Sequence, residues 1–171
     1  MTRKPKRELL TEPVARLDAE AVSAALQRGL AGLPPLATPD EDPALAAQVV
    51  WVAEGDEALV HVDATEVRLT DGALLVSVEL ETDRWRRQPI VMPFALGKPG
   101  EAAGLLATTG ELPRGEPLIV ARWGALVQDA VWASLLALTL AVAPPARPPV
   151  GIGVADGRLV VETAAAEVAP A

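Results

Sequence analysis

TEVRLTDGALLVSVELE, residues 65–81, is the stretch of sequence that decides the fold. The Asp71-Gly72 pair favours a tight turn between two antiparallel strands, because both residue types tolerate the positive φ that such turns need. In residues 73–81 one set of alternating side chains is wholly apolar and the other set is mostly polar. A strand with this pattern buries one face and leaves the other largely in water. The stretch therefore predicts a hairpin in an antiparallel sheet.

Further strand-like segments lie on both sides of this hairpin in the sequence. Residues 46–53 and 57–63 flank residues 54–56, which have the composition of a turn. Residues 89–96 favour another strand, but they contain two prolines. Proline has no amide N–H to donate, which confines such a strand to the edge of a sheet. We expect an antiparallel sheet of four or five strands.

Two helices are expected, one before the strands and one after them. Asp18 is placed to cap a helix that runs to about Ala31, with an apolar stripe along one side. The second helix runs from about Arg122 to Val142 and is the most apolar element of the chain. Its uncharged part is shorter than the roughly 20 apolar residues of a membrane span and ends in prolines. We therefore expect this helix to cover the sheet, with no membrane contact.

Shorter elements complete the expected organisation. Residues 101–108 favour a short helix and residues 117–120 a strand. The pair Asp156-Gly157 favours a second hairpin, which either extends the sheet or reaches a neighbouring subunit. The sequence thus predicts an α+β fold in a single domain. The expected parts are a flexible basic N-terminal arm (1–16), the core domain (17–143), a proline-rich linker (144–149), a C-terminal β-hairpin (150–163) and a disordered tail (164–171).

The shortage of reactive side chains restricts the function more than any motif does. The chain has no Cys, no Tyr, one His and three Ser. These residue types supply most nucleophiles, general bases and soft metal ligands, so we expect neither a metal site nor a cofactor, and the composition argues against an enzyme. The net charge of −8 argues against nucleic acid, whose phosphates it would repel. The Arg-rich, Ala-rich composition is typical of a bacterial genome of high GC content.

The expected location is the cytoplasm. Without Cys the chain has no disulfide framework that would require an oxidising compartment. The basic residues near the start of the chain are not followed by an apolar segment of the kind found in secretory signals.

One set of residues leaves an enzymatic alternative open. His61 and Asp63 lie two apart on an expected strand, so their side chains share a face, and Glu79 and Ser77 lie on the polar face of a nearby strand. These residues suggest a hydrolase or a metal-dependent enzyme. However, Ser77 is not in the G-x-S-x-G turn that exposes a hydrolytic serine, and a solvated polar face of the sheet explains the pattern equally well.

A second alternative rests on a basic cluster, Arg84-Trp85-Arg86-Arg87. Guanidinium groups and an indole ring can hold phosphate or stack on a base, so these residues are candidates for binding a phosphate group or nucleic acid. The cluster also fits a charged hairpin tip that protects a sheet edge.

The leading hypothesis is a non-enzymatic protein-interaction module, such as a small subunit, an adaptor or a chaperone. It would act by burying an apolar helix or sheet face against a protein partner or a second copy of the chain. A helix that is apolar on all sides must be buried against another surface, and the chain has few side chains suited to catalysis.

Overall fold

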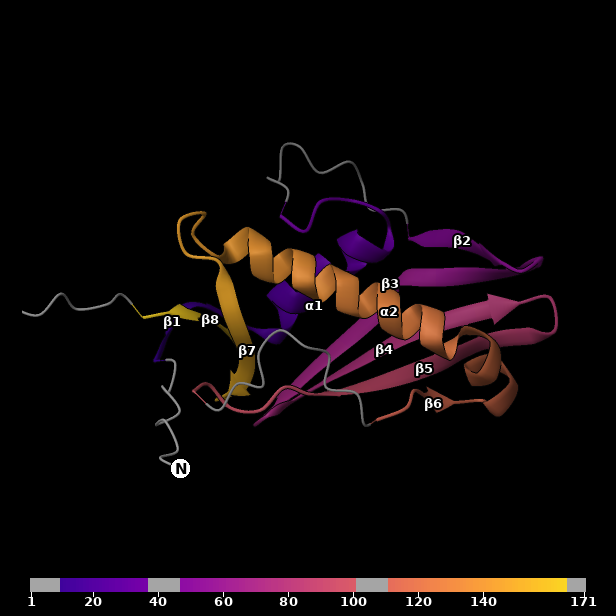
Figure 1. Cartoon of the computed structure of the whole chain (residues 1–171). Coiled ribbons are helices and arrows are strands. Elements are labelled where there is room, and N and C mark those ends of the chain that lie inside the picture. Colours follow the sequence, from indigo (N-terminus) through magenta and orange to yellow (C-terminus); the bar gives the residue numbers. More distant parts are fainter. Residues whose placement is uncertain (1–9, 37–46, 101–110, 166–171) are drawn as a thin grey trace, which may run out of the picture.

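The described residues form two helices and two antiparallel sheets, which confirms the α+β prediction (Figure 1). The computed structural model describes residues 10–36, 47–100 and 111–165. The helices are α1 Ala19–Leu30 and α2 Pro117–Val142. The strands are β1 Thr11–Leu17, β2 Gln48–Ala53, β3 Asp56–Thr70, β4 Ala73–Thr82, β5 Trp85–Ala95, β6 Arg114–Gly115, β7 Pro149–Ala155 and β8 Arg158–Ala164.

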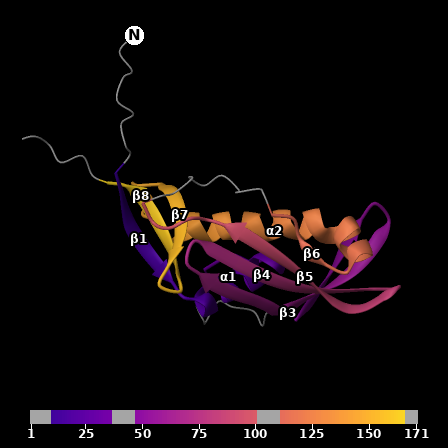
Figure 2. The same ribbon diagram turned by 90° about the horizontal axis from the view of Figure 1, so that it is seen from below.

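The larger sheet is a meander of five strands in the order β2-β3-β4-β5-β6. The predicted Asp71-Gly72 turn joins β3 to β4, and Gly72 has a φ of 77°. The alternation in β4 is confirmed, because its apolar set is fully buried while the other set is half-buried. Figure 2 shows α2 lying along one face of this sheet. The buried side chains of β4 are Leu74, Val76, Val78 and Leu80.

Helix α1 begins where the sequence predicted. The Asp18 carboxylate accepts a hydrogen bond of 2.9 Å from the Ala21 amide, and Gly32 follows the helix with a φ of 78°. Such an N-cap contributes about 1 kcal/mol. The helix buries Val22 and Leu26 completely and packs against α2 and β3. Thus the two helices form one layer over the larger sheet.

Helix α2 starts earlier than expected, and the predicted strand over residues 117–120 is wrong. Pro117 occupies the first turn, where its missing N–H has no partner to lose. The Glu116 carboxylate accepts hydrogen bonds of 2.9 Å from the amides of Leu118 and Ile119. Because of this capping, the strand-like sequence PLIV (residues 117–120) forms the start of a helix of 26 residues.

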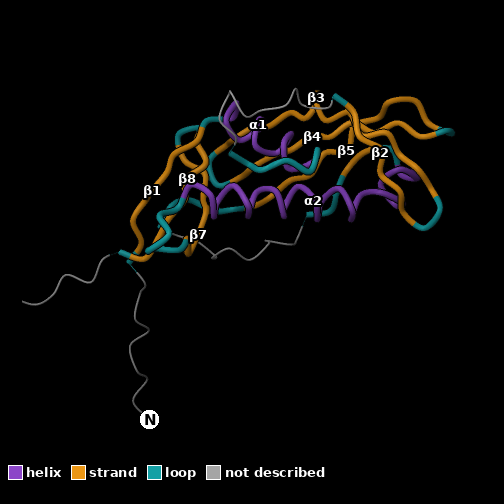
Figure 3. Tube along the Cα trace, turned by 90° about the horizontal axis from the view of Figure 1, so that it is seen from above, coloured by secondary structure: helices purple, strands orange, loops and turns teal. Residues whose placement is uncertain are grey.

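The smaller sheet has the order β1-β8-β7 (Figure 3). The predicted C-terminal hairpin is therefore present as β7 and β8, but its sheet partner is β1 of the same chain. The expected flexible arm over residues 1–16 is wrong from residue 11 onward, because β1 pairs along β8. The buried Glu162 carboxylate helps to hold β1, since one of its oxygens accepts from the Thr11 hydroxyl at 2.9 Å.

The two Asp-Gly turns meet, and this contact joins the two sheets. The Gly72 amide donates to the carbonyl of Val154 at 2.9 Å, and the Val154 amide donates to the carbonyl of Gly97 at 2.9 Å. The Asp156 amide also donates to the Asp71 carboxylate at 3.2 Å. The expected short helix at 101–108 and most of the expected tail, from residue 166 on, lie outside the described residues.

Candidate interaction surface

Strand β2 forms an edge of the larger sheet and exposes apolar side chains. It pairs with β3 on one side only, and the described part of the chain places no strand on its other side. Val50 and Val52 point to the face of the sheet opposite the helices, and they are 61% and 67% exposed. Val49 and Trp51 point toward the helices and are half-buried. Both faces of this edge strand are therefore apolar.

Helix α2 also leaves an apolar face uncovered. Its most apolar window has a mean hydropathy of 1.7, yet only 33% of that window is buried within the chain. From Leu118 to Ala133 exposed positions recur every three or four residues, which is the spacing of a single face. Asp129 is the one charged residue among the exposed positions of α2. These positions are Pro117, Leu118, Ala121, Ala125, Leu126, Asp129, Ala133, Leu140 and Ala141.

An apolar groove connects this helix face with β2. Its volume is about 440 Å³, and all of its lining residues are apolar. The strand supplies Trp51 and its neighbours, and the helix supplies Leu126, which is 43% exposed. We call this groove and its rim the β2–α2 surface. Its residues are Val50, Trp51, Val52, Ala53, Trp123, Leu126 and Ala130.

A larger, polar pocket of about 670 Å³ lies at the end of the sheet that is remote from β1, β7 and β8. The β2–β3 turn, the β4–β5 turn and the start of α2 line it. Arg84 and Arg122 contribute positive charge, and Trp85 and Trp123 contribute rings. Three carboxylates line the same pocket, so its charge does not favour an anionic ligand. They are Asp56, Glu57 and Asp83.

Arg122 connects α2 to the β2–β3 turn in this pocket. Its guanidinium donates to the Asp56 carboxylate at 2.6 Å, to the Glu54 carboxylate at 2.8 Å and to the carbonyl of Ala53. The hydrogen bond to Asp56 is the main reason that the pKa of Arg122 is raised from its ordinary value. Since that value is already very high, the guanidinium stays charged wherever the protein is folded. Arg122 therefore holds the β2–β3 turn in position beside α2.

We expect the Arg122→Gln substitution to loosen the β2–β3 turn without unfolding the domain. Hydrogen exchange followed by mass spectrometry should show severalfold faster exchange of the amides of residues 53–57. The matched control is Arg68→Gln, since the Arg68 side chain is 78% exposed and its nearest carboxylate contact, to Glu66, is 4.0 Å long. Equal exchange of the turn in the two variants would show that Arg122 does not hold it.

The predicted basic cluster does not form one surface. Arg84 and Trp85 line the polar pocket on the helix side, whereas Arg87 pairs with the Glu79 carboxylate across the sheet. A register shift between Leu80 and Thr82 separates these two groups. Consequently Arg84 and Trp85 are not presented to a ligand together with Arg87.

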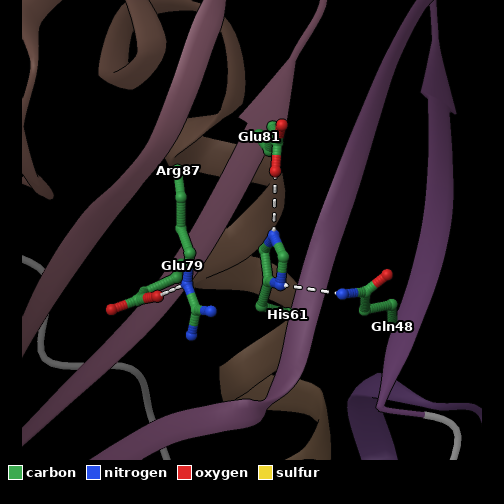
Figure 4. Close-up of polar contacts among 5 residues, drawn as sticks. All are labelled: Gln48, His61, Glu79, Glu81 and Arg87. Carbon is green, nitrogen blue, oxygen red and sulfur yellow. Dashed lines mark hydrogen bonds and ion pairs between the residues drawn. The ribbon is translucent and has the colours of Figure 1, made fainter.

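His61 is buried between two side chains that the sequence analysis did not include. One ring nitrogen lies 3.3 Å from the Gln48 amide nitrogen, and the other lies 3.3 Å from a Glu81 oxygen (Figure 4). Glu79 is opposite His61 in the strand register, but its carboxylate contacts Arg87. The spacing of Glu79 and Glu81, two apart on one face, is the sequence signal that could have indicated Glu81.

The other proposed catalytic residues lie apart from His61. The β3–β4 register shifts between His61 and Glu66, and Ser77 lies opposite Glu66 beyond this shift. Asp63 is within the shifted segment and is exposed. No group of three or more His, Cys, Asp or Glu in residues 10–36, 47–100 and 111–165 is arranged to hold a metal ion.

Comparisons with protein-family models, with curated proteins and with solved structures found no match to this chain.

Proposed function

We propose that this protein is a non-enzymatic protein-interaction module, and that another polypeptide covers its β2–α2 surface. The observation that carries the proposal is the continuous apolar surface made by an edge strand and a long helix. Exposed apolar patches that are contiguous and rimmed by polar groups mark interaction sites more often than isolated apolar residues do. The surface belongs to the folded core, so a partner would meet a preformed site.

Covering this surface would contribute favourably to the free energy of binding. Fully burying an aliphatic side chain is worth about 1.5–3 kcal/mol, so half-exposed residues contribute about 1 kcal/mol each. Val50, Val52 and Leu126 are all between 43% and 67% exposed. Trp51 adds an indole ring, the type of side chain that dominates binding energy at protein interfaces.

A membrane-spanning role for α2 has less support than a protein partner. α2 is long and apolar enough to cross a membrane, and it is the one helix of this kind in the described ranges. However, its fully buried side chains, such as Val127, Val131 and Leu135, are part of the core shared with the sheet and α1. Insertion into a bilayer would remove them from that core and expose the apolar face of the sheet to water.

Site-specific photo-crosslinking tests the proposal. p-Benzoylphenylalanine replaces Leu126 in one variant and Arg68, which is exposed on the opposite face, in the other. In the cells that naturally produce the protein, we expect discrete protein adducts at position 126, several times more abundant than at position 68. Mass spectrometry then identifies each adduct as this chain or as another polypeptide. Equal crosslinking at the two positions would refute the proposal.

A further inference from the structure

The geometry points to a second copy of this chain as the polypeptide that covers the β2–α2 surface. In this inference β2 pairs antiparallel with β2 of the other copy, about a two-fold axis perpendicular to the sheet. The two larger sheets become one continuous sheet, with α2 of both copies on the same face. The inference rests on the proposed function and specifies its partner.

The other sheet edges carry features that prevent strand pairing. Natural proteins protect edges with prolines, bulges, charges or very short strands, because an open edge pairs with other chains. β1 contains Pro13 next to an irregularity in its register, and β7 begins at Pro149 next to another. β5 contains Pro89 and Pro93, and the strand beyond it, β6, has only 2 residues. Three of the four sheet edges formed by the described residues are therefore blocked.

The β2 edge has none of these features. Its sequence, QVVWVA, contains no Pro, no Gly and no charged residue. It pairs with β3 in an uninterrupted register from Gln48 to Ala53, so the strand has no bulge that would turn its edge away. An unprotected, apolar edge on an otherwise protected fold is expected where pairing is part of the native structure.

The strand is complementary to itself. A two-fold axis perpendicular to the sheet keeps each side chain on its own face, so residues that meet across the axis must have the same parity. Every register centred on a residue satisfies this condition, and the two that overlap most of β2 are centred on Val50 and on Trp51. In both registers the valines of the outer face meet apolar or uncharged side chains, and the helix-side residues meet each other under the two α2 helices. Cross-strand pairs of this kind stabilise sheets.

Charge also favours a second copy. The chain carries a net charge of −8, which opposes self-association through charged surfaces. β2 has no charge, and within the β2–α2 surface no residue is charged. Two copies can therefore meet along the β2 edge without placing like charges opposite each other, and a basic partner would find no carboxylate on this strand.

The required contact area explains why α2 must take part. A stable interface uses about 20–30 residues on each side, whereas β2 has 6 residues. A lone strand from another protein would cover only the edge. A second copy brings its own α2 beside the first one, so that the outward residues of α2 add to the 6 residues of β2 and bring the interface closer to that number.

Analytical ultracentrifugation of the purified full chain tests the inference. We expect a dimer with a dissociation constant in the micromolar range. Val50→Lys should weaken the association roughly hundredfold, since it places like charges near each other across the β2–β2 contact at the centre of the interface. The matched control, Leu112→Lys, alters a residue that is 80% exposed just before β6, at the opposite edge, and should leave the association unchanged. Val52→Lys serves as a second variant, because both valines are exposed and neither substitution disturbs the core.

Engineered cysteines identify the strand register, because the natural chain contains no Cys. If Val50 lies on the axis, Val50→Cys alone should form an intermolecular disulfide under mild oxidation. If Trp51 lies on the axis, a disulfide should form between Val50→Cys and Val52→Cys chains when they are mixed. Either disulfide supports the inference, since opposed Cβ atoms across a strand pair are close to disulfide distance.

Failure of this inference differs from failure of the proposed function. A monomer at every concentration, or a dimer that neither lysine variant weakens, would overturn the β2–β2 pairing. If position 126 still crosslinks strongly to a different polypeptide, the interaction module stands with another partner. If position 126 crosslinks no more than position 68, the proposed function is also wrong.

Discussion

Replacing Gly153 by alanine is expected to destabilise the protein by about 3 kcal/mol, at the upper end of the cost of overpacking a core. Gly153 lies in β7, where a Cβ atom would be 2.8 Å from the Pro99 nitrogen and 2.9 Å from the Lys98 carbonyl carbon. It would also be 3.1 Å from the Gly97 oxygen. All three are backbone atoms, so no side-chain rotation relieves the clash.

Neighbouring hydrogen bonds prevent residues 97–99, which lie against Gly153, from moving away. The Gly97 carbonyl accepts from Val154, and the amides of Leu96 and Gly97 both donate to the carbonyl of Gly72 at 2.9 Å. Moving residues 97–99 would break the contact that joins the two sheets. The Gly153→Ala variant must therefore either keep the short contacts between the new Cβ and the backbone of residues 97–99 or lose these hydrogen bonds.

Urea denaturation measures this effect, with the midpoint and slope fitted together. In a thermal melt, 3 kcal/mol corresponds to a decrease in Tm of about 6–12 °C for a chain of this size. Ala155→Ser is the control, since it also adds one heavy atom to β7 but at a half-exposed position. It should change stability by less than about 0.5 kcal/mol. An equally small change for Gly153→Ala would contradict the close crossing of residues 97–99 over β7.

The sequence alone was enough to predict those elements that depend on a few neighbouring residues. The Asp-Gly turns at 71–72 and 156–157 and the Asp18 cap depend on a few neighbouring residues, and all three are present. The start of α2 was missed because a cap at Glu116 and a proline in the first turn outweighed the strand-like side chains that follow. Strand β1 was missed because its sheet partner, β8, is at the other end of the sequence.

The sequence did not locate the β2–α2 surface. The sequence indicated an apolar helix that needs cover, whereas the position of β2 at an edge depends on the whole strand order. Its signal was present in QVVWVA, since a strand that is apolar on both faces is normally covered on both. The Arg84–Arg87 cluster shows the opposite case. Its residues are adjacent in sequence, but a register shift in the hairpin separates their side chains.

Gly29→Ala is expected to destabilise the protein by about 2 kcal/mol, although alanine is intrinsically about 1 kcal/mol better than glycine in a helix. Gly29 is where α1 crosses α2, and a Cβ atom there would lie 2.2 Å from the Ser134 hydroxyl oxygen and 2.5 Å from its Cβ. The oxygen can rotate away, but the Cβ of Ser134 cannot. The two helices would therefore have to separate, which would disturb the layer that supports the β2–α2 surface.

A double-mutant cycle isolates this contact. Ser134→Gly removes both atoms that clash and leaves the nearest remaining atom, the Ser134 Cα, at 3.4 Å from the new Cβ. Each single variant should be destabilised, Ser134→Gly by about 0.5 kcal/mol from helix propensity. The double variant should be more stable than the sum of the two effects predicts, with a coupling of about 2 kcal/mol measured by urea denaturation. Additive effects would mean that α1 and α2 do not approach at Gly29, and that the helix layer under the interaction surface is packed differently.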